Sequence, residues 1–121
     1  MKRSALKTYL NGFSGAQEEY PFGPQAVVFK VGKKMFALLT TTESDVVRLN
    51  LKCDPEWALT LRASYEAIVP GYHMNKTHWN SVLFDGSLSE EQVKEMVEHS
   101  YELVLASLSK KVREQYARTN T

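Results

Sequence analysis

The chain has 121 residues, 43% of them hydrophobic and 24% charged, and its formal net charge is +1. This composition is typical of a soluble globular protein, and the length fits one domain over residues 1–121. The single cysteine excludes an internal disulfide, and no apolar run approaches the roughly 18 residues of a membrane span, so we expect a cytoplasmic protein without membrane contacts.

The first half of the chain predicts one helix followed by three strands. Apolar side chains recur at helical spacing over residues 3–11, and the turn-rich segment Tyr20–Pro24 follows, in which two prolines forbid regular helix. Strands are predicted over 26–31 and 34–41, joined by Gly32 and Lys33, a turn whose leading glycine suits type II′. Residues 45–52 alternate, which predicts a strand with Arg48, Asn50 and Lys52 on a half-exposed outer face.

The second half predicts three helices and one further strand. Asp54 and Pro55 begin a helix that runs to about Ser64, and residues 68–77 lack a regular pattern. A strand is predicted over 81–85, Ser89 and Gln92 form a capping box before a long helix, and Ser109 begins a last short basic helix. The fold class is therefore α+β: a two-layer sandwich of a mostly antiparallel sheet with helices on one face. Because residues 35–39 are apolar on both faces, we expect part of each side of the middle strand to be covered.

The segment from Gly71 to Asn80 concentrates chemically versatile side chains. It contains two histidines, two asparagines, a lysine and two aromatic residues within ten positions. Loops of this composition carry binding function when a rigid scaffold presents them. The structural alternative is that Trp79 and Met74 plug the open side of the sheet while the polar groups cap local backbone.

Basic residues concentrate in the first part of the chain. Residues 1–52 have a net charge of +4 and residues 53–121 a net charge of −3. Lys30, Lys33 and Lys34 lie on the predicted hairpin, and Arg48 and Lys52 lie on the next strand. A projecting basic hairpin suits contacts to phosphates, whereas lysines on a strand edge also serve to prevent edge-to-edge aggregation.

The sequence carries no catalytic or metal-binding motif. The spacing of His73 and His78 matches neither a helical zinc pair nor a zinc finger, and no activated serine or phosphate-binding glycine loop is present. Cys53 precedes a predicted helix start, where a helix dipole lowers a thiol pKa, but a lone cysteine is more often a small buried hydrophobe. We therefore expect a non-enzymatic protein with no metal and no cofactor.

Several segments together resemble the bacterial MmcQ/YjbR family. The similarity runs in order from about Lys7 to Arg113, and its most specific part is His-Met-Asn-Lys at 73–76 followed by His-Trp at 78–79. The other matching segments are Tyr20–Pro24, Phe29–Ala37, Asn50–Pro55, Pro70–Tyr72, Leu83–Leu88 and Ser100–Val104. The resemblance implies a single CyaY-like α+β domain of the "double wing" type. Family members are usually labelled DNA-binding and have no agreed catalytic residues.

These observations give two hypotheses of different classes. The first is a DNA-binding domain in which Lys30, Lys33, Lys34, Arg48 and Lys52 contact phosphates, and His73, Asn75, Lys76 and His78 line the same surface. A base contact is expected at Asn75 or Lys76. The second is a protein- or small-molecule-binding module that uses the exposed sheet face and the His73–Trp79 loop. A monomer is the default expectation at this size, and a symmetric dimer would place two wings on successive grooves.

Overall fold

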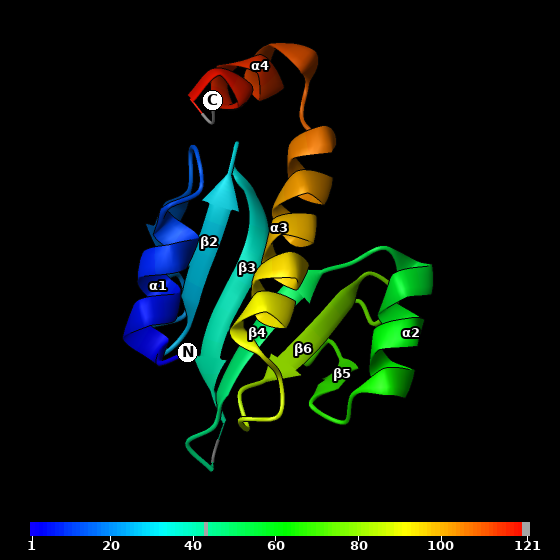
Figure 1. The fold of residues 1–121 in the computed structure, drawn as a ribbon. Helices are drawn as coiled ribbons and strands as arrows, with labels where there is room; N and C mark the ends of the chain where they lie inside the picture. Colours follow the sequence, from blue (N-terminus) through cyan, green and yellow to red (C-terminus); the bar gives the residue numbers. More distant parts are fainter. Residues whose placement is uncertain (43, 120–121) are drawn as a thin grey trace.

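One antiparallel sheet and the helices on one of its faces make up the fold (Figure 1). The computed structural model describes residues 1–42 and 44–119, with side chains described up to residue 116. The elements in chain order are α1 (Arg3–Asn11), β1 (Gln17–Glu19), β2 (Val27–Val31), β3 (Lys34–Thr41), β4 (Val47–Lys52), α2 (Pro55–Ser64), β5 (Ile68–Pro70), β6 (Trp79–Leu83), α3 (Glu90–Ala106) and α4 (Lys110–Thr119).

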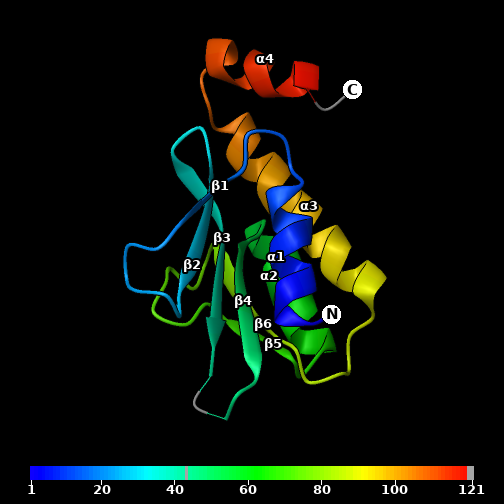
Figure 2. The same ribbon diagram turned by 90° about the vertical axis from the view of Figure 1, so that its left-hand side faces the viewer.

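The sheet has the strand order β1-β2-β3-β4-β6-β5, and every neighbouring pair is antiparallel. Figure 2 shows it nearly edge-on, with α1, α2 and α3 all on one side. The predicted α+β sandwich with helices on one face is therefore confirmed. We call the other side the open face of the sheet.

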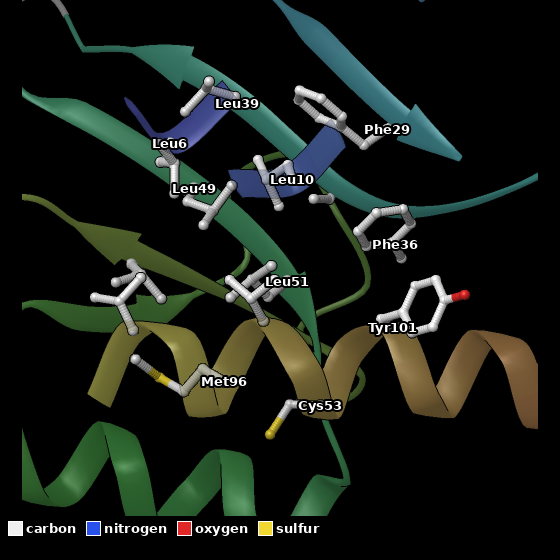
Figure 3. Close-up of a cluster of buried hydrophobic side chains, with 14 of the residues drawn as sticks. Leu6, Leu10, Phe29, Phe36, Leu39, Leu49, Leu51, Cys53, Met96 and Tyr101 are labelled. Atoms are coloured by element: carbon white, nitrogen blue, oxygen red, sulfur yellow. The ribbon is translucent and has the colours of Figure 1, made fainter. Parts of the chain in front are cut away.

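The hydrophobic core lies between the sheet and these helices (Figure 3). Leu6 and Leu10 enter it from α1, and Val97 and Tyr101 enter it from α3. Phe36 on β3 is fully buried at its centre, with ring centroids 5.9 Å from Phe13 and 5.3 Å from Tyr101. The strand residues that meet the helices alternate along the strands, because successive side chains point to opposite faces. The exception is on β3, where the β2–β3 register shifts and the adjacent residues Phe36 and Ala37 both belong to the core.

Local capping signals place the helices where the sequence predicts them. The Asp54 carboxylate accepts the Trp57 N–H at the start of α2, and Ser89 and Gln92 form the capping box of α3. Ser109 accepts the Val112 N–H at the start of α4. These bonds satisfy backbone donors that have no partner inside the helix.

The strands differ from the prediction in three places. β1 and β5 were not predicted, and β6 covers Trp79–Leu83 instead of residues 81–85. The β2–β3 turn is type I′ and not type II′, because φ is positive at both Gly32 (57°) and Lys33 (71°). A Cβ at Gly32 would lie 2.6 Å from Leu108 Cδ1, so packing against the α3–α4 junction also favours glycine there.

Candidate functional site

Two loops cover part of the open face of the sheet. One joins β1 to β2 and contains Tyr20–Pro24, and the other joins β5 to β6 and spans residues 71–78. In Figure 2 both lie on the side of the sheet away from the helices. Under these loops Val28 is 2% exposed and Asn50 is 1% exposed, although both face away from the core. The prediction that Asn50 lies on a half-exposed face is therefore wrong, because that face is covered at this point.

A buried polar network holds the 71–78 loop against the sheet. Asn50 and Ser81 are register partners on β4 and β6, and the Ser81 hydroxyl donates to Asn50 Oδ1 at 2.5 Å. The same hydroxyl oxygen accepts the Tyr72 N–H at 2.9 Å, and the Asn50 amide donates to the Leu38 carbonyl at 3.3 Å. Because each buried polar atom has a partner, the network fixes the loop where Tyr72 begins.

The far end of the same loop is held from α2. The Arg62 guanidinium donates to the carbonyls of Lys76 and Trp79 and, at 2.6 Å, to Asn80 Oδ1. Gly71 packs so tightly that an added Cβ would lie 2.8 Å from Trp79 Cβ and 2.9 Å from the Trp79 carbonyl oxygen. The loop therefore leaves and rejoins the sheet at fixed points.

Aromatic and cationic side chains stack where this loop crosses the open face. The Arg48 guanidinium carbon lies 4.0 Å from the centroid of the Tyr72 ring, within the range of a cation–π contact. The His73 ring centroid is also 4.0 Å from that of Tyr72, and His73 has a positive φ of 58°. Tyr72 is still 52% exposed, so the stack presents an aromatic surface to solvent.

The Tyr20–Pro24 loop is anchored at its first residue. The Tyr20 hydroxyl donates to Glu18, and it accepts a hydrogen bond from the Lys7 ammonium at 2.9 Å. Asn11 donates to Glu18 at 2.6 Å, and the Lys7 ammonium lies 3.2 Å from the same carboxylate. Hydrogen bonds from Tyr20 and Asn11 are the main causes that lower the pKa of Glu18, which falls to about 2. The hydrogen bond and the positive charge of Lys7 contribute further in the same direction.

We expect Glu18→Gln to reduce stability at neutral pH by about 0.5 to 1 kcal/mol, the size of a partly exposed ion pair. The folded protein holds this carboxyl below its usual pKa near 4.5, so the native state binds fewer protons than the unfolded chain between that value and about 2. The stabilisation is therefore full above the usual pKa and disappears as the pH falls toward 2. Urea unfolding of both proteins from neutral to acidic pH tests this, and a difference that does not shrink on acidification contradicts it.

Between the two loops the open face contains a hollow of about 630 Å³, which we call the open-face hollow. Its apolar lining comes from Phe22, Val28, Met35, Leu38, Tyr72 and Met74. Lys30 and His73 are the basic side chains of the lining. This volume is within the range of small-molecule sites, which are mostly apolar with a few polar groups.

The five basic strand residues proposed from the sequence do not form one free surface. Lys30 pairs with Glu19 at 3.2 Å, and Arg48 is stacked on Tyr72. Lys34 donates to the carbonyl and the hydroxyl of Ser107, at the end of α3. Lys33 is exposed at the hairpin tip, and Lys52 is half-buried on β4.

The four proposed loop residues have mixed roles. His73 and Met74 both line the open-face hollow. Asn75 Oδ1 accepts the Thr77 N–H at 2.9 Å, so this amide caps local backbone. Lys76 and His78 are exposed, and their carbonyls bind Arg62 and the Cys53 N–H.

The structure brings together a basic group that the sequence did not connect. The β2–β3 hairpin meets the α3–α4 junction, where Lys34 contacts Ser107 and Gly32 packs near Leu108 (Figure 1). Lys110 and Lys111 begin α4 directly after this junction. Together with Lys33 and Lys34 they form what we call the basic end. The sequence predicted a basic last helix, but it contained no signal for the position of that helix.

Cys53 is a buried free thiol next to the start of α2. Burial, with a smaller contribution from Asp54, raises the pKa of Cys53 to about 11, opposite to the lowering considered from its position before α2. Within residues 1–42 and 44–119 no three His, Cys, Asp or Glu side chains are placed to share a metal ion. In the same ranges no helix is long and apolar enough to span a membrane.

The fold is an α+β domain in which two loops partly cover the face of the sheet that is opposite the helices. The chain belongs to the YjbR family, whose model matches residues 11–103. This agrees with the resemblance seen in the sequence.

Two relatives are uncharacterized proteins of Escherichia coli. YbdF is 41% identical over 92 residues, which cover 76% of this chain and 75% of YbdF. YjbR is 32% identical over 113 residues, which cover 93% of this chain and 95% of YjbR.

Solved structures show the same fold. A Deinococcus radiodurans protein with a DUF419 domain superimposes with a TM-score of 0.85 at 35% identity, covering 94% of this chain and 86% of that one. A Pseudomonas syringae protein superimposes with a TM-score of 0.76 at 30% identity, covering 86% of this chain and 99% of the other.

Proposed function

We propose that this protein is a non-enzymatic binding module that takes an apolar group of its ligand into the open-face hollow. The observation that carries the proposal is the apolar open-face hollow between two anchored loops, where Met35 and Leu38 are only half-buried and Phe22 is 75% exposed. Covering an exposed phenyl ring with a binding partner is favourable, by about 25 cal/mol per Å² of apolar area buried. Both loops are held by hydrogen bonds, so the hollow is formed before the ligand arrives.

We expect Phe22→Ala to weaken the binding of a neutral aromatic probe, 2-naphthamide, by about threefold to tenfold, because one aromatic wall is lost. Leu59→Ala is the matched control, since Leu59 is 64% exposed but lies on α2, on the helical side. Both substitutions should leave the free energy of unfolding within about 0.5 kcal/mol, as both side chains are largely in water. Titration followed by amide shifts in ¹⁵N–¹H NMR spectra measures the affinity and locates the site. Equal affinities of the two variants, or shifts centred away from Tyr72–Met74, contradict the proposal.

A second candidate function, nucleic-acid binding, is favoured by the basic end. Its four lysines come from two segments far apart in the sequence, and none takes part in the ion pairs found among the described residues. Such a cluster suits contacts to phosphates, which are independent of base sequence and sensitive to salt. On this second proposal the nucleic-acid surface consists of the hairpin and α4, and it keeps Lys33 and Lys34 from the sequence hypothesis.

On this second proposal, Lys110→Glu with Lys111→Glu should weaken binding to a mixed-sequence duplex and reduce the log–log salt slope by about 1 for each phosphate that is no longer neutralised. Fluorescence anisotropy of a labelled duplex at about 50 and 200 mM salt measures both effects. The control is Lys52→Glu with Lys76→Glu, which changes the net charge equally on the surface first proposed from the sequence. A greater loss in the control returns the site to the surface of β4 and the 71–78 loop. No binding by the unaltered protein at the lower salt rejects nucleic-acid binding.

A further inference from the structure

The open-face hollow has an ion pair at its side. Lys30 lines the hollow, and its ammonium lies 3.2 Å from the Glu19 carboxylate on β1. The two side chains are 30% and 43% exposed, so the pair is open to solvent. An ammonium has three donors, and a single carboxylate contact leaves donors for a second acceptor.

The charges around the open-face hollow favour an anion. Lys30 is on its lining, and the Arg48 guanidinium contacts the ring of Tyr72, which is also part of the lining. Glu19 is the acidic side chain that the structure pairs with Lys30. A cationic ligand would therefore meet the like charges of Lys30 and Arg48, whereas a carboxylate would accept a hydrogen bond from the Lys30 ammonium.

The walls define the rest of the ligand. Phe22 and Tyr72 enter from different loops, and the floor consists of Val28, Met35 and Leu38. Aromatic side chains favour flat rings through offset or edge-to-face contacts. A volume of about 630 Å³ fits a molecule of one or a few rings.

We propose that the ligand of the open-face hollow is a small aromatic carboxylate, with its ring between Phe22 and Tyr72 and its carboxylate on the Lys30 ammonium. This assignment rests on the proposed function of the hollow. The Glu19 carboxylate competes with the ligand carboxylate for Lys30, which limits the affinity. Lys30 makes the hollow bind acids more tightly than neutral analogues.

Three probes with the same bicyclic ring test the charge preference: 2-naphthoate, 2-naphthamide and 2-naphthylmethylammonium. The unaltered protein should bind the acid about threefold to tenfold more tightly than the amide, and the ammonium most weakly. Amide-shift titrations by NMR give the three affinities on one protein sample.

Variants of the ion pair assign this preference to Lys30. Lys30→Met should remove the difference between acid and amide while the amide affinity stays within about twofold, and Lys30→Arg should retain the preference. Glu19→Gln should tighten binding of the acid alone, because the competing carboxylate is gone. Lys52→Met is the control, since Lys52 is another half-buried lysine whose side chain is not part of the lining.

The outcomes separate this assignment from the proposed function. If acid and amide bind equally and Lys30→Met changes neither, the carboxylate assignment is overturned and the hollow remains an apolar site. If none of the probes binds at millimolar concentration, the proposed function itself fails. If Lys52→Met removes the preference as Lys30→Met does, the selectivity comes from overall charge and not from this ion pair, and the assignment is again overturned.

Discussion

Replacing Phe36 with alanine is expected to lower the free energy of unfolding by about 3 to 5 kcal/mol. Phe36 is fully buried, and its ring contacts Phe13 after α1, Phe29 on β2 and Tyr101 on α3. The substitution therefore leaves a cavity where three elements meet, and the sheet backbone cannot close it. Urea unfolding followed by circular dichroism measures the loss.

Phe22→Ala is the matched control for Phe36→Ala, because it removes the same phenyl group from a position that is 75% exposed. Its cost should be within about 0.5 kcal/mol. Similar costs at the two positions would contradict the core described here. A loss below about 1 kcal/mol for Phe36→Ala would mean that the helices close over the cavity.

Ser81→Ala is expected to lower stability by about 1 to 3 kcal/mol and also to weaken the binding of 2-naphthamide about threefold or more. The Ser81 hydroxyl joins two buried groups, the Asn50 side chain and the Tyr72 N–H. Without this hydroxyl, the Asn50 side chain and the Tyr72 N–H lose a hydrogen-bond partner. Tyr72, which forms one wall of the open-face hollow, is then no longer fixed to the sheet at this point. Urea unfolding and the NMR titration measure the two effects separately.

Ser100→Ala is the control that separates stability from binding. Ser100 is equally buried, accepts the Lys52 N–H at 2.9 Å and donates to the Phe36 carbonyl at 2.6 Å, but it comes from α3 on the helical side. It should cost a similar free energy of unfolding and leave the affinity for 2-naphthamide unchanged. If both variants lose affinity equally, general loosening of the sheet is responsible and the specific role of the Asn50–Ser81 network is wrong.

The sequence predicted the elements whose signals are local. The caps at Asp54 and Ser89 begin α2 and α3, because a side chain there satisfies backbone donors within the same turn. The alternation on β4 correctly separated Leu49 and Leu51 from Arg48, since the strand period assigns faces. The apolar middle strand predicted cover over part of each side: the helices bury Phe36 and Leu39, whereas Met35 and Leu38 remain half-buried on the lining of the open-face hollow.

The sequence did not predict the elements that form only against a neighbour. β1 and β5 have three residues each, too few for a period, and they exist because β2 and β6 offer free edges. Trp79 and Asn80 looked like loop because of their polar surroundings, but they pair with Lys52 and Leu51 on β4. The type I′ turn requires a positive φ at Lys33, which lysine adopts under the constraint of the hairpin twist.

The candidate site divides in the same way. Local patterns in the sequence predicted an α+β domain and directed attention to the 71–80 segment, and the resemblance of several segments indicated the YjbR family. Lys30, Arg48 and His73 were named from the sequence as candidates for nucleic-acid contact. Only the tertiary structure placed Phe22 and Tyr72 on the lining of one hollow, paired Lys30 with Glu19 and brought the α3–α4 junction to the hairpin at Lys34. The physical reason is range: caps and strand periods act within a few residues, whereas hollows and charge clusters depend on packing between segments distant in the chain.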